Sequence, residues 1–216
     1  MRQPRYIVVE GPIGVGKTTL AQRLAAALKA DLLLELAEEN PFLPRFYQNP
    51  ESSALPTQLH FLFQRARQLE SLRQTDMFRQ ALVADFMIQK DRLFAEVTLA
   101  PAELELYYQA YNHLTLEAPA PDLVIYLQAS VDSLLRRVRE RGIDYEQNIH
   151  EHYLDRVANA YIEFFYYYQE APLLIVNTED FNLATGSEDF NLLLKHIREL
   201  SPGRHYLNPQ SLEPQF

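Results

Sequence analysis

Short apolar runs alternate with segments of helical periodicity along most of the chain. Five runs of three to five residues have the length and composition of strands: Tyr6–Val9, Leu32–Leu34, Ala81–Ala84, Leu123–Leu127 and Leu173–Val176. The fourth run is apolar throughout, as in strands buried on both faces of a parallel sheet. Because consecutive parallel strands need crossover segments between them, the pattern predicts a five-stranded parallel sheet with helices on both faces.

Helical spacing of apolar residues fills the intervals between these runs. It starts at Leu20, Leu24 and Leu28, and further helices are expected at 53–72, 91–99, 101–116, 131–141 and 188–200. After the helix at 131–141 we expect a short connection and then a long helix that ends at about Gln169. Gly142 is placed to end the helix that begins at Val131. The proline-rich stretch 40–44 is expected to break regular structure. We therefore expect one domain over residues 1–200, followed by a tail at 201–216 with little core-forming content.

Composition narrows the class of protein. The 216 residues are 47% hydrophobic and 23% charged, which suits a single globular core. A formal net charge of -9 argues against general binding of nucleic acid, which needs a basic face. There is no apolar run long enough to span a membrane and no signal-peptide pattern at the start, so we expect a cytoplasmic protein. The absence of cysteine excludes thiol catalysis and zinc–thiolate sites.

A glycine-rich loop follows the first predicted strand and opens the first helix. Its residues fit the Walker A pattern: Gly11, Pro12, Ile13, Gly14, Val15, Gly16, Lys17 and Thr18, with Thr19 next. In this context backbone N–H groups surround the β-phosphate of a nucleotide, Lys17 reaches the β and γ oxygens, and Thr18 can ligate Mg²⁺. The loop predicts a three-layer fold of P-loop NTPase type that binds ATP and Mg²⁺. It does not separate kinases from GTPase switches or motors.

Two of the later strands end in an acid. Glu35 follows the second run and Asp85 follows the third. Ligands of an open parallel sheet lie at the carboxyl ends of its strands, so both acids are expected near the glycine loop. Phosphoryl transfer to an alcohol needs a base and a metal ligand, and two acids can divide those roles. The alternative is that both are solvated loop residues or helix caps.

With these residues the sequence resembles the deoxynucleoside kinase family, over most of the chain from Tyr6 to about Phe181. The segment Glu35-Leu36-Ala37-Glu38-Glu39-Asn40-Pro41 is similar to one in bacterial deoxyadenosine and deoxyguanosine kinases whose first glutamate is the base for the 5′-hydroxyl. The resemblance assigns that role to Glu35.

A substrate pocket is also implied. Gln58 and Arg65 are seven residues apart on one predicted helix face and could project into one pocket. The resemblance implies that they bind the base together with Asp91, and that Tyr47 and Glu146 bind the sugar. Family members that favour thymidine usually lack such an Arg–Asp pair, so the resemblance implies a purine deoxynucleoside or deoxycytidine as substrate. Without the resemblance, Arg65 would be read as a surface residue.

Four arginines crowd the end of one predicted helix before Gly142. Cations are favoured at a helix C-terminus, which accounts for one or two of them. The resemblance implies a helical lid at about 137–148 in which Arg137 and Arg141 close over the phosphates, although Ile143 stands where a further lid arginine is expected. It also implies that the backbone of Glu179, Asp180 and Phe181 contacts the base of the phosphate donor.

The chain departs from the family pattern directly after Asp85. Many relatives carry an arginine where this chain has Phe86, and a phenylalanine cannot hold a hydroxyl or a phosphate. Lys90 lies one helical turn further on, and we expect it to supply the missing charge. Asp85 retains the acid that would organise Mg²⁺.

The expected function is transfer of the γ-phosphate of ATP, or another nucleoside triphosphate, to the 5′-hydroxyl of deoxyadenosine, deoxyguanosine or deoxycytidine. Two alternatives stay open. One is a nucleoside monophosphate kinase of thymidylate kinase type, and the other is a nucleotide-binding regulator with weakened catalysis, suggested by Phe86 and Ile143. The resemblance further implies a homodimer.

Overall fold

Six parallel strands form one sheet at the centre of the protein. The computed structural model describes residues 4–74, 81–114, 119–179, 181 and 186–208. The strand order is β2-β3-β1-β4-β5-β6, and every neighbouring pair is parallel. The strands are β1 (Tyr6–Glu10), β2 (Asp31–Leu33), β3 (Leu82–Ala84), β4 (Leu123–Gln128), β5 (Leu173–Asn177) and β6 (Arg204–Leu207).

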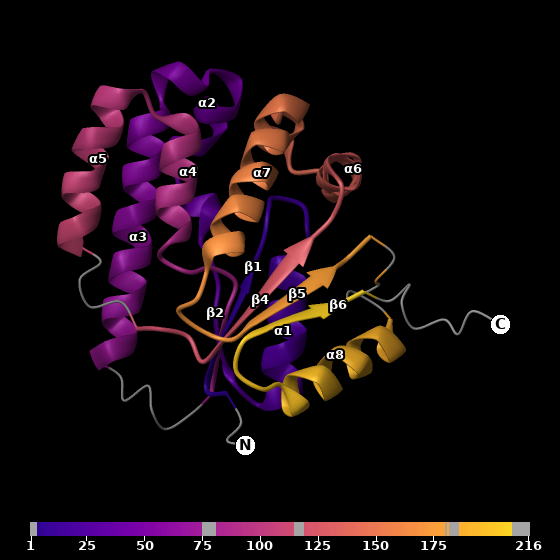
Figure 1. Cartoon of the computed structure of the whole chain (residues 1–216). Coiled ribbons are helices and arrows are strands. Elements are labelled where there is room, and N and C mark those ends of the chain that lie inside the picture. The colour runs from indigo at the N-terminus through magenta and orange to yellow at the C-terminus, as the bar shows by residue number, and fades with distance from the viewer. Residues whose placement is uncertain (1–3, 75–80, 115–118, 180, 182–185, 209–216) are drawn as a thin grey trace.

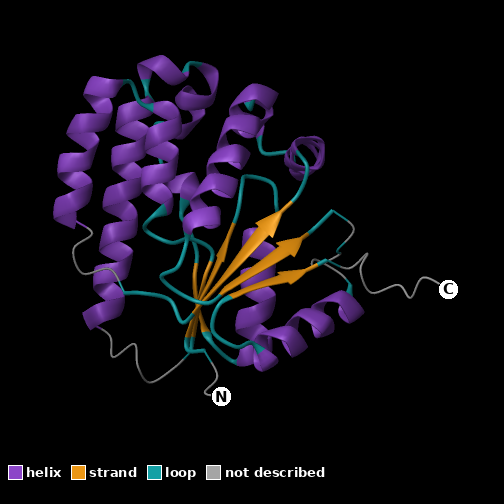
Figure 2. Cartoon of the chain, viewed as in Figure 1, coloured by secondary structure: helices purple, strands orange, loops and turns teal. Residues whose placement is uncertain are grey.

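Helices cover both faces of this sheet (Figures 1 and 2). They are α1 (Lys17–Leu28), α2 (Leu43–Gln48), α3 (Ala54–Gln74), α4 (Lys90–Thr98), α5 (Pro101–Leu114), α6 (Val131–Arg141), α7 (Glu151–Tyr167) and α8 (Ser187–Glu199). Short 3-10 segments lie at η1 (Ala37–Glu39), η2 (Pro50–Ser52) and η3 (Asp144–Asn148). α3 and α5 stand outside α4, at the side of the sheet that carries β2.

The alternation of side chains along the strands creates two apolar cores. Ile7 and Val9 of β1 face one core with residues of α1 and α8, whereas Tyr6 and Val8 face the other with residues of α4 and α7. Since both faces are covered, β1 is buried along its whole length. Full burial of one such aliphatic side chain contributes about 1.5–3 kcal/mol. The continuous apolar runs of the sequence follow from this two-sided burial.

The order of the strands places the glycine loop at the middle of the sheet. β1 lies between β3 and β4, so the chain turns to one side for β2 and β3 and to the other for β4 to β6. This reversal is the switch point at which open α/β sheets bind ligands, outside the carboxyl ends of the strands. The residues that follow β1, β2 and β3 therefore meet in one place.

Two sequence-based expectations about the fold are wrong. The sheet has six strands rather than five, because Arg204–Leu207 of the expected tail pairs with β5. Leu207 is buried, so part of the tail belongs to the core. The stretch 40–44 does not simply break regular structure either, since α2 begins at Leu43. Pro44 is tolerated there because the first turn of a helix needs no backbone donor.

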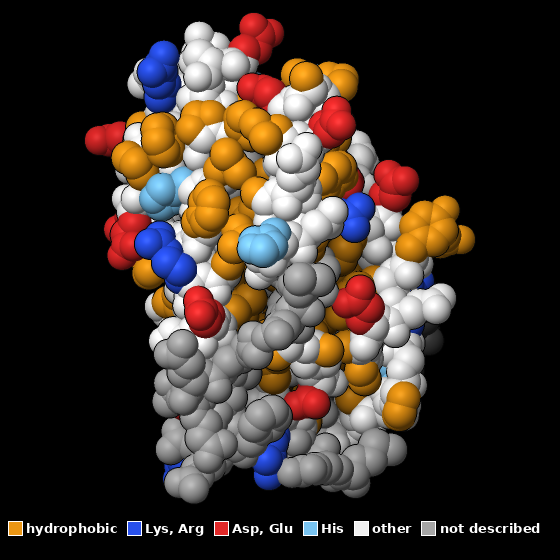
Figure 3. Space-filling view, turned by 90° about the vertical axis from the view of Figure 1, so that its left-hand side faces the viewer, with side chains coloured by type: hydrophobic (Ala, Val, Ile, Leu, Met, Phe, Trp, Pro, Cys, Tyr) orange, Lys and Arg blue, Asp and Glu red, His pale blue; other side chains and the backbone are white. Residues whose placement is uncertain are grey.

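The surface over α3 and α5 shows hydrophobic side chains gathered among charged ones (Figure 3). Phe63 and Leu106 are about half exposed, at 46% and 52%. Within the residues that the structure describes, no helix combines the length and apolar character needed to cross a membrane.

Candidate active site

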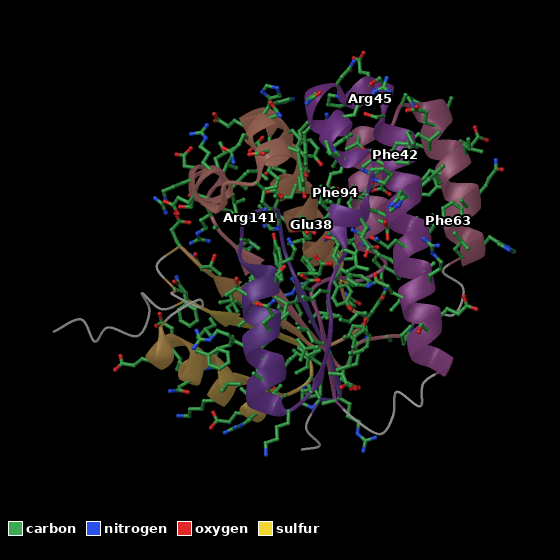
Figure 4. The ribbon with its side chains drawn as sticks, turned by 180° about the vertical axis from the view of Figure 1, so that it is seen from behind. Glu38, Phe42, Arg45, Phe63, Phe94 and Arg141 are labelled. Atoms are coloured by element: carbon green, nitrogen blue, oxygen red, sulfur yellow. The ribbon has the colours of Figure 1, made fainter. Side chains whose placement is uncertain are left out.

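A pocket lies at the carboxyl ends of the strands and joins the glycine loop to α2, α3, α4 and the end of α6. Its cavity volume is about 140 Å³, and side chains from all of these elements line it. Figure 4 shows Glu38 and Arg141 at the upper end of α1, near the opening. The lining includes twelve residues expected to form the site: Ile13, Gly14, Lys17, Thr18, Glu35, Tyr47, Gln58, Arg65, Asp85, Lys90, Arg141 and Glu146.

Close packing explains why the loop after β1 needs glycine. A Cβ atom on Gly11 would lie 2.5 Å from the carbonyl oxygen of Leu127 in β4. Gly14 has a φ of +85°, and a Cβ atom there would lie 2.7 Å from the carbonyl oxygen of Leu134 in α6. Both approaches are too close for any side chain, so the loop is wedged between the sheet and α6 with its backbone facing the pocket.

Two polar side chains at the start of α1 are oriented by the loop and by β3. The Lys17 ammonium donates to the carbonyl oxygens of Gly11 and Pro12, at 2.8 and 3.1 Å. The Thr18 hydroxyl donates to Asp85 Oδ2 at 2.6 Å. Asp85 Oδ1 accepts from the backbone N–H of Glu35 at 2.7 Å, so a single carboxylate links the glycine loop to the segment after β2. The next residue, Thr19, is exposed.

The carboxylate of Glu35 lies between two cations. Lys90 Nζ donates to Glu35 Oε2 at 2.8 Å, and the Arg65 guanidinium donates to Glu35 Oε1. The Glu35 side chain is 16% exposed, whereas both cations are almost fully buried. Glu35 therefore presents an oriented carboxylate to the pocket. Its contact with Lys90 brings the charge of that lysine to the part of the pocket where the sequence analysis expected it.

Arg65 is the centre of a buried network. Its guanidinium also pairs with Asp91, which is completely buried behind it. The guanidinium carbon lies 4.8 Å from the ring centre of Phe61 and 5.8 Å from that of Phe86, distances typical of cation–π contact. Phe86 thus supports Arg65 from the core. Burial raises the pKa of Asp91 to about 6, although Arg65 opposes that shift.

The Nε atom of Arg65 and the Oδ2 atom of Asp91 are buried without a hydrogen-bond partner. One is a donor and the other an acceptor, and such groups are costly when left unpaired. Gln58, on the same face of α3, lines the pocket as the spacing predicted. The network is therefore suited to a polar ligand that carries complementary groups, such as a nucleobase.

Aromatic residues close the other side of the pocket. Tyr47 on α2 is buried and stacks on Tyr145 of η3, with ring centres 6.2 Å apart and an interplanar angle of 8°. Glu146, the next residue, is buried and pairs with Arg141 at the end of α6. The sequence analysis did not find Tyr145, because only the tertiary fold brings η3 against α2.

Residues expected on the side of the phosphate donor lie near the end of β5. Arg137 is turned away from the pocket lining and donates to the hydroxyl and carbonyl oxygens of Thr178, at 3.0 and 2.6 Å. Glu179 binds the first turn of α6, where it accepts from the backbone N–H of Ser130 at 2.8 Å. Phe181 is buried in the core, and Asp180 lies outside the described residues.

A third strand-end acid was missed by the sequence analysis. Glu10 ends β1 immediately before the glycine loop and is completely buried. The signal that pointed to Glu35 and Asp85, an acid at the end of an apolar run, is also present at Glu10.

Burial also changes the two pocket lysines. It lowers the pKa of Lys17 to about 7, with the charge of Lys90 acting in the same direction. It lowers the pKa of Lys90 to about 8, against the opposing effect of the nearby carboxylates, of which Glu10 is the strongest. Both lysines therefore titrate near neutral pH, and anionic groups placed between them would restore their charge.

The Thr18 hydroxyl and the Asp85 carboxylate fit a magnesium site. They are adjacent at the start of α1, and Mg²⁺ in nucleotide sites takes few protein ligands, all oxygens, together with phosphate and water. Among the described residues there is no cluster of three or more histidine or acidic side chains that could hold a metal by itself. A metal at this position would therefore depend on the nucleotide.

Comparisons with known proteins agree with this arrangement. The chain is 35% identical to deoxyguanosine kinase of Bacillus subtilis over 207 residues, which cover 93% of this chain and 99% of that protein. It is 30% identical to deoxyguanosine kinase of Lactobacillus johnsonii, over 88% of this chain and 90% of that one. The solved structure of deoxyadenosine kinase from M. mycoides with bound dATP has a TM-score of 0.76 at 23% identity, covering 89% and 98% of the two chains.

The sequence model described as deoxynucleoside kinase matches residues 7–201. That range contains the glycine loop, the acids after β2 and β3, and every element that lines the pocket. Because the match covers nearly the whole described structure and a relative at 35% identity agrees with it, this chain belongs to the deoxynucleoside kinase family.

Proposed function

We propose that this protein transfers the γ-phosphate of ATP, or of another nucleoside triphosphate, to the 5′-hydroxyl of a deoxyribonucleoside. The observation that carries the proposal is the position of Glu35, whose carboxylate lines the same pocket as Lys17 and Thr18 of the glycine loop. A carboxylate beside a phosphate-binding loop can accept the proton of an alcohol. The names of similar proteins, deoxyguanosine kinase and deoxyadenosine kinase, support the same reaction.

The phosphate donor would bind along the glycine loop. The glycine loop, residues 11–19, would surround its phosphates with backbone N–H groups from Ile13 onward and with the N-terminus of α1, and the backbone at 179–181 would contact its base. The related M. mycoides enzyme was solved with bound dATP, which supports a nucleotide in this position. Arg137 lies beside Thr178 and would act from this side, as part of a lid at about 137–148.

The reaction would proceed by direct transfer. Glu35 accepts the 5′-hydroxyl proton as the oxygen forms its bond to the γ-phosphorus, and the bond to the β–γ bridging oxygen breaks with release of the nucleoside diphosphate. Lys17 and Arg141 offset the negative charge on the transferred group. Lys90 holds Glu35 in place and adds a cation where Phe86 offers none.

Thr18 and Asp85 would hold Mg²⁺ together with the nucleotide phosphates. When bound, the ion would offset charge on the β and γ oxygens. The contribution of the chain itself is the orientation of these two ligands, since the Thr18 hydroxyl and the backbone of Glu35 both bind Asp85.

The acceptor would be a deoxyadenosine, deoxyguanosine or deoxycytidine. Its base would meet Gln58 and Arg65, with Asp91 holding Arg65 from behind, and its sugar would meet Tyr47 and Glu146. Gln58 and Arg65 line the pocket and together offer donors and an acceptor, which supports a base with complementary groups. Relatives that favour thymidine usually lack such an Arg–Asp pair, so thymidine should be a poor substrate.

The proposal is tested by measuring phosphorylation with ATP and Mg²⁺ of the four deoxynucleosides, the ribonucleosides and the nucleoside monophosphates. We expect turnover with at least one of the three favoured deoxynucleosides and little with thymidine. Failure to phosphorylate any nucleoside would refute the proposal. Thymidine as the best substrate would refute the assignment of Arg65 and Asp91.

Glu35→Gln tests the role of the base. The amide keeps the shape but cannot accept the proton, so kcat should fall by about 10²–10⁴-fold while ATP binding changes little. The matched control is Glu38→Gln, an exposed acid three residues further on, which should leave kcat unchanged. Equal rates for Glu35→Gln and the unchanged protein would rule out Glu35 as the base.

The two alternatives make different predictions in the same assay. A nucleoside monophosphate kinase would need free cations for the acceptor phosphate, yet Lys90 and Arg65 are both paired with Glu35. It would use monophosphates and leave nucleosides unchanged. A regulator with weakened catalysis would bind ATP without turnover of either class.

We also propose a homodimer in the cytoplasm, where nucleoside triphosphates are available. Ile162 and Tyr166 on the outer face of α7 are 53% and 67% exposed, which supports helix packing against a second copy. Light scattering after gel filtration would measure the mass. Ile162→Arg should then give a monomer, and a monomeric unchanged protein would contradict the proposal.

A further inference from the structure

A buried acid that the proposed reaction does not use directly lies behind the glycine loop. Glu10 is the last residue of β1, the central strand, and its side chain is shielded completely from solvent. Burying a carboxylate is costly unless hydrogen bonds or charges compensate it. The contacts of Glu10 therefore indicate what the carboxylate does in this position.

Three donors from separate parts of the chain bind this carboxylate. Glu10 Oε1 accepts from the backbone N–H of Met87 at 2.8 Å. Glu10 Oε2 accepts from the backbone N–H of Gly11 at 3.1 Å and from the hydroxyl of Tyr161 in α7 at 2.9 Å. One side chain thus joins the start of the glycine loop, the segment after Asp85 and the helix that follows the lid.

No cation among the described residues forms an ion pair with Glu10, yet Lys90 at the start of α4 is within its electrostatic reach. The charge of Glu10 favours the charged form of Lys90. The other groups that act on Lys90 are the acids Asp85 and Asp91, the acid Glu35 in contact with it, and the cations Lys17 and Arg65. Glu10 also acts on the hydroxyl groups of Tyr6, Tyr126 and Tyr161, whose protonated forms it favours.

We propose that Glu10 is a positioning residue for phosphoryl transfer, which fixes the glycine loop to the segment after β3 and balances the charge of Lys90 from inside the protein. The inference rests on the proposed function, because it assigns Lys90 and the glycine loop to the phosphate end of that site. Glu10 does not touch the substrate. It acts through the loop and through Lys90.

The anchoring and the electrostatic effects can be separated by substitution. Glu10→Gln removes the charge, and its amide nitrogen would oppose the N–H of Gly11 or Met87. Glu10→Asp keeps the charge but is one methylene shorter and cannot reach all three donors. Tyr161→Phe keeps the carboxylate and both backbone donors, so it is the matched control.

The measurement is the pH dependence of kcat with saturating ATP and the best deoxynucleoside, after thermal denaturation has identified the variants that fold. At alkaline pH kcat should fall as Lys90 loses its proton. In Glu10→Gln this fall, the alkaline limb, should move to lower pH by about one unit, because loss of a nearby negative charge lowers the pKa of a lysine. Glu10→Asp should keep the limb in place but lower kcat by about 10-fold, since the loop is less well fixed. Tyr161→Phe should change neither.

Several results would overturn the inference. One such result is a folded Glu10→Gln variant whose kcat falls at the same alkaline pH as that of the unchanged protein. Two others are a Glu10→Asp variant in which this alkaline fall is shifted, and a Glu10→Asp variant with an unchanged kcat. If Glu10→Gln does not fold, Glu10→Asp decides alone. A Tyr161→Phe variant that matches Glu10→Gln would assign the effect to α7 instead of the charge.

A binding measurement separates this inference from the proposed function. Binding of a fluorescent ATP analogue can be measured at one pH without any acceptor. If the unchanged protein phosphorylates no nucleoside but Glu10→Asp binds the analogue more weakly than the unchanged protein, the proposed function fails and the anchoring of the loop by Glu10 stands. If the two proteins bind the analogue equally, the anchoring role of Glu10 fails, whatever the activity.

Discussion

At the scale of single residues, the pairing of Glu35 shows how this chain accommodates Phe86. An aromatic side chain cannot offer a charge, but Phe86 lies beneath the Arg65 guanidinium and helps to hold it between Glu35 and Asp91. The second cation comes from Lys90, which reaches Glu35 from the start of α4. The charge that Phe86 does not offer is thus supplied by Arg65 and Lys90, which both contact Glu35.

Substitution of Lys90 tests this interpretation. Lys90→Ala should lower kcat by about 10²-fold or more, because an oriented charge in a site shielded from water is lost. Lys90→Arg should recover part of the rate. Arg92→Ala is the control, since Arg92 is exposed and pairs with Glu96 on the same helix. Steady-state kinetics in which Lys90→Ala and Arg92→Ala behaved alike would contradict the role of Lys90.

The pH dependence of the reaction should report Lys90. Burial lowers its pKa to about 8, so its proton is lost as the pH rises through that value. If the charged form is needed, kcat should fall on the alkaline side near pH 8. Bound ATP adds negative charge beside Lys17 and raises the pKa of that residue, so Lys90 should dominate this limb in the complex. A kcat that stays constant to pH 10 would contradict this assignment.

At the scale of secondary-structure elements, β6 connects the C-terminal segment to the far end of α7. Arg204 in β6 donates to the carbonyl oxygens of Phe165 and Tyr166 at 2.8 Å, where α7 ends. The last carbonyl groups of a helix have no partner within it, and a cation there also favours the helix dipole. β6 therefore does more than extend the edge of the sheet.

Arg204→Ala should destabilise the protein by about 1 kcal/mol, the usual effect of losing hydrogen bonds that are partly exposed to water. The midpoint of thermal unfolding should fall by about 2–4 °C for a domain of this size. Arg198→Ala, an exposed arginine on α8, provides the comparison and should leave the midpoint unchanged. Calorimetry with equal midpoints for both variants would show that Arg204 does not stabilise α7.

For the molecule as a whole, buried tyrosines in the two cores make the stability of the fold depend on pH in the alkaline range. The chain contains 13 tyrosines and no tryptophan, and several tyrosines are inside the fold. Burial raises the pKa of Tyr6, Tyr153, Tyr161 and Tyr168 well above its ordinary value, and that of Tyr126 to about 12. The phenolic forms are therefore favoured by folding.

This gives a stability that is present below pH 10 and lost above it. In the unfolded chain these tyrosines ionise near pH 10, whereas in the folded protein they stay protonated, so rising pH draws the equilibrium towards unfolding. Circular dichroism and tyrosinate absorbance, followed together against pH, should show that the buried tyrosines ionise only as the helix signal is lost. Ionisation of all tyrosines near pH 10 with the helix signal intact would contradict this expectation.

Local periodicity and turn chemistry were sufficient to predict the strands of the inner sheet, most of the helices and the glycine loop, whereas α2 was not predicted. The sequence also placed Gln58 and Arg65 on one helix face, and the structure brings both to the pocket with Glu35 and Asp85. Gly142 ends α6 in a left-handed conformation, as the sequence predicted.

Three features could not be predicted from the sequence and are seen only in the folded structure. They are the sixth strand, the stacking of Tyr145 on Tyr47 and the position of Glu10 beside the glycine loop. Each of these depends on contacts between segments far apart in the chain: β6 pairs with β5, and Glu10 binds Tyr161 from α7. Short edge strands and buried acids have little local signature, since their free energy comes from partners that the sequence pattern does not identify. Periodicity therefore predicted the strands, helices and glycine loop that surround the site. Burial and long-range hydrogen bonds determine which charged side chains lie inside it.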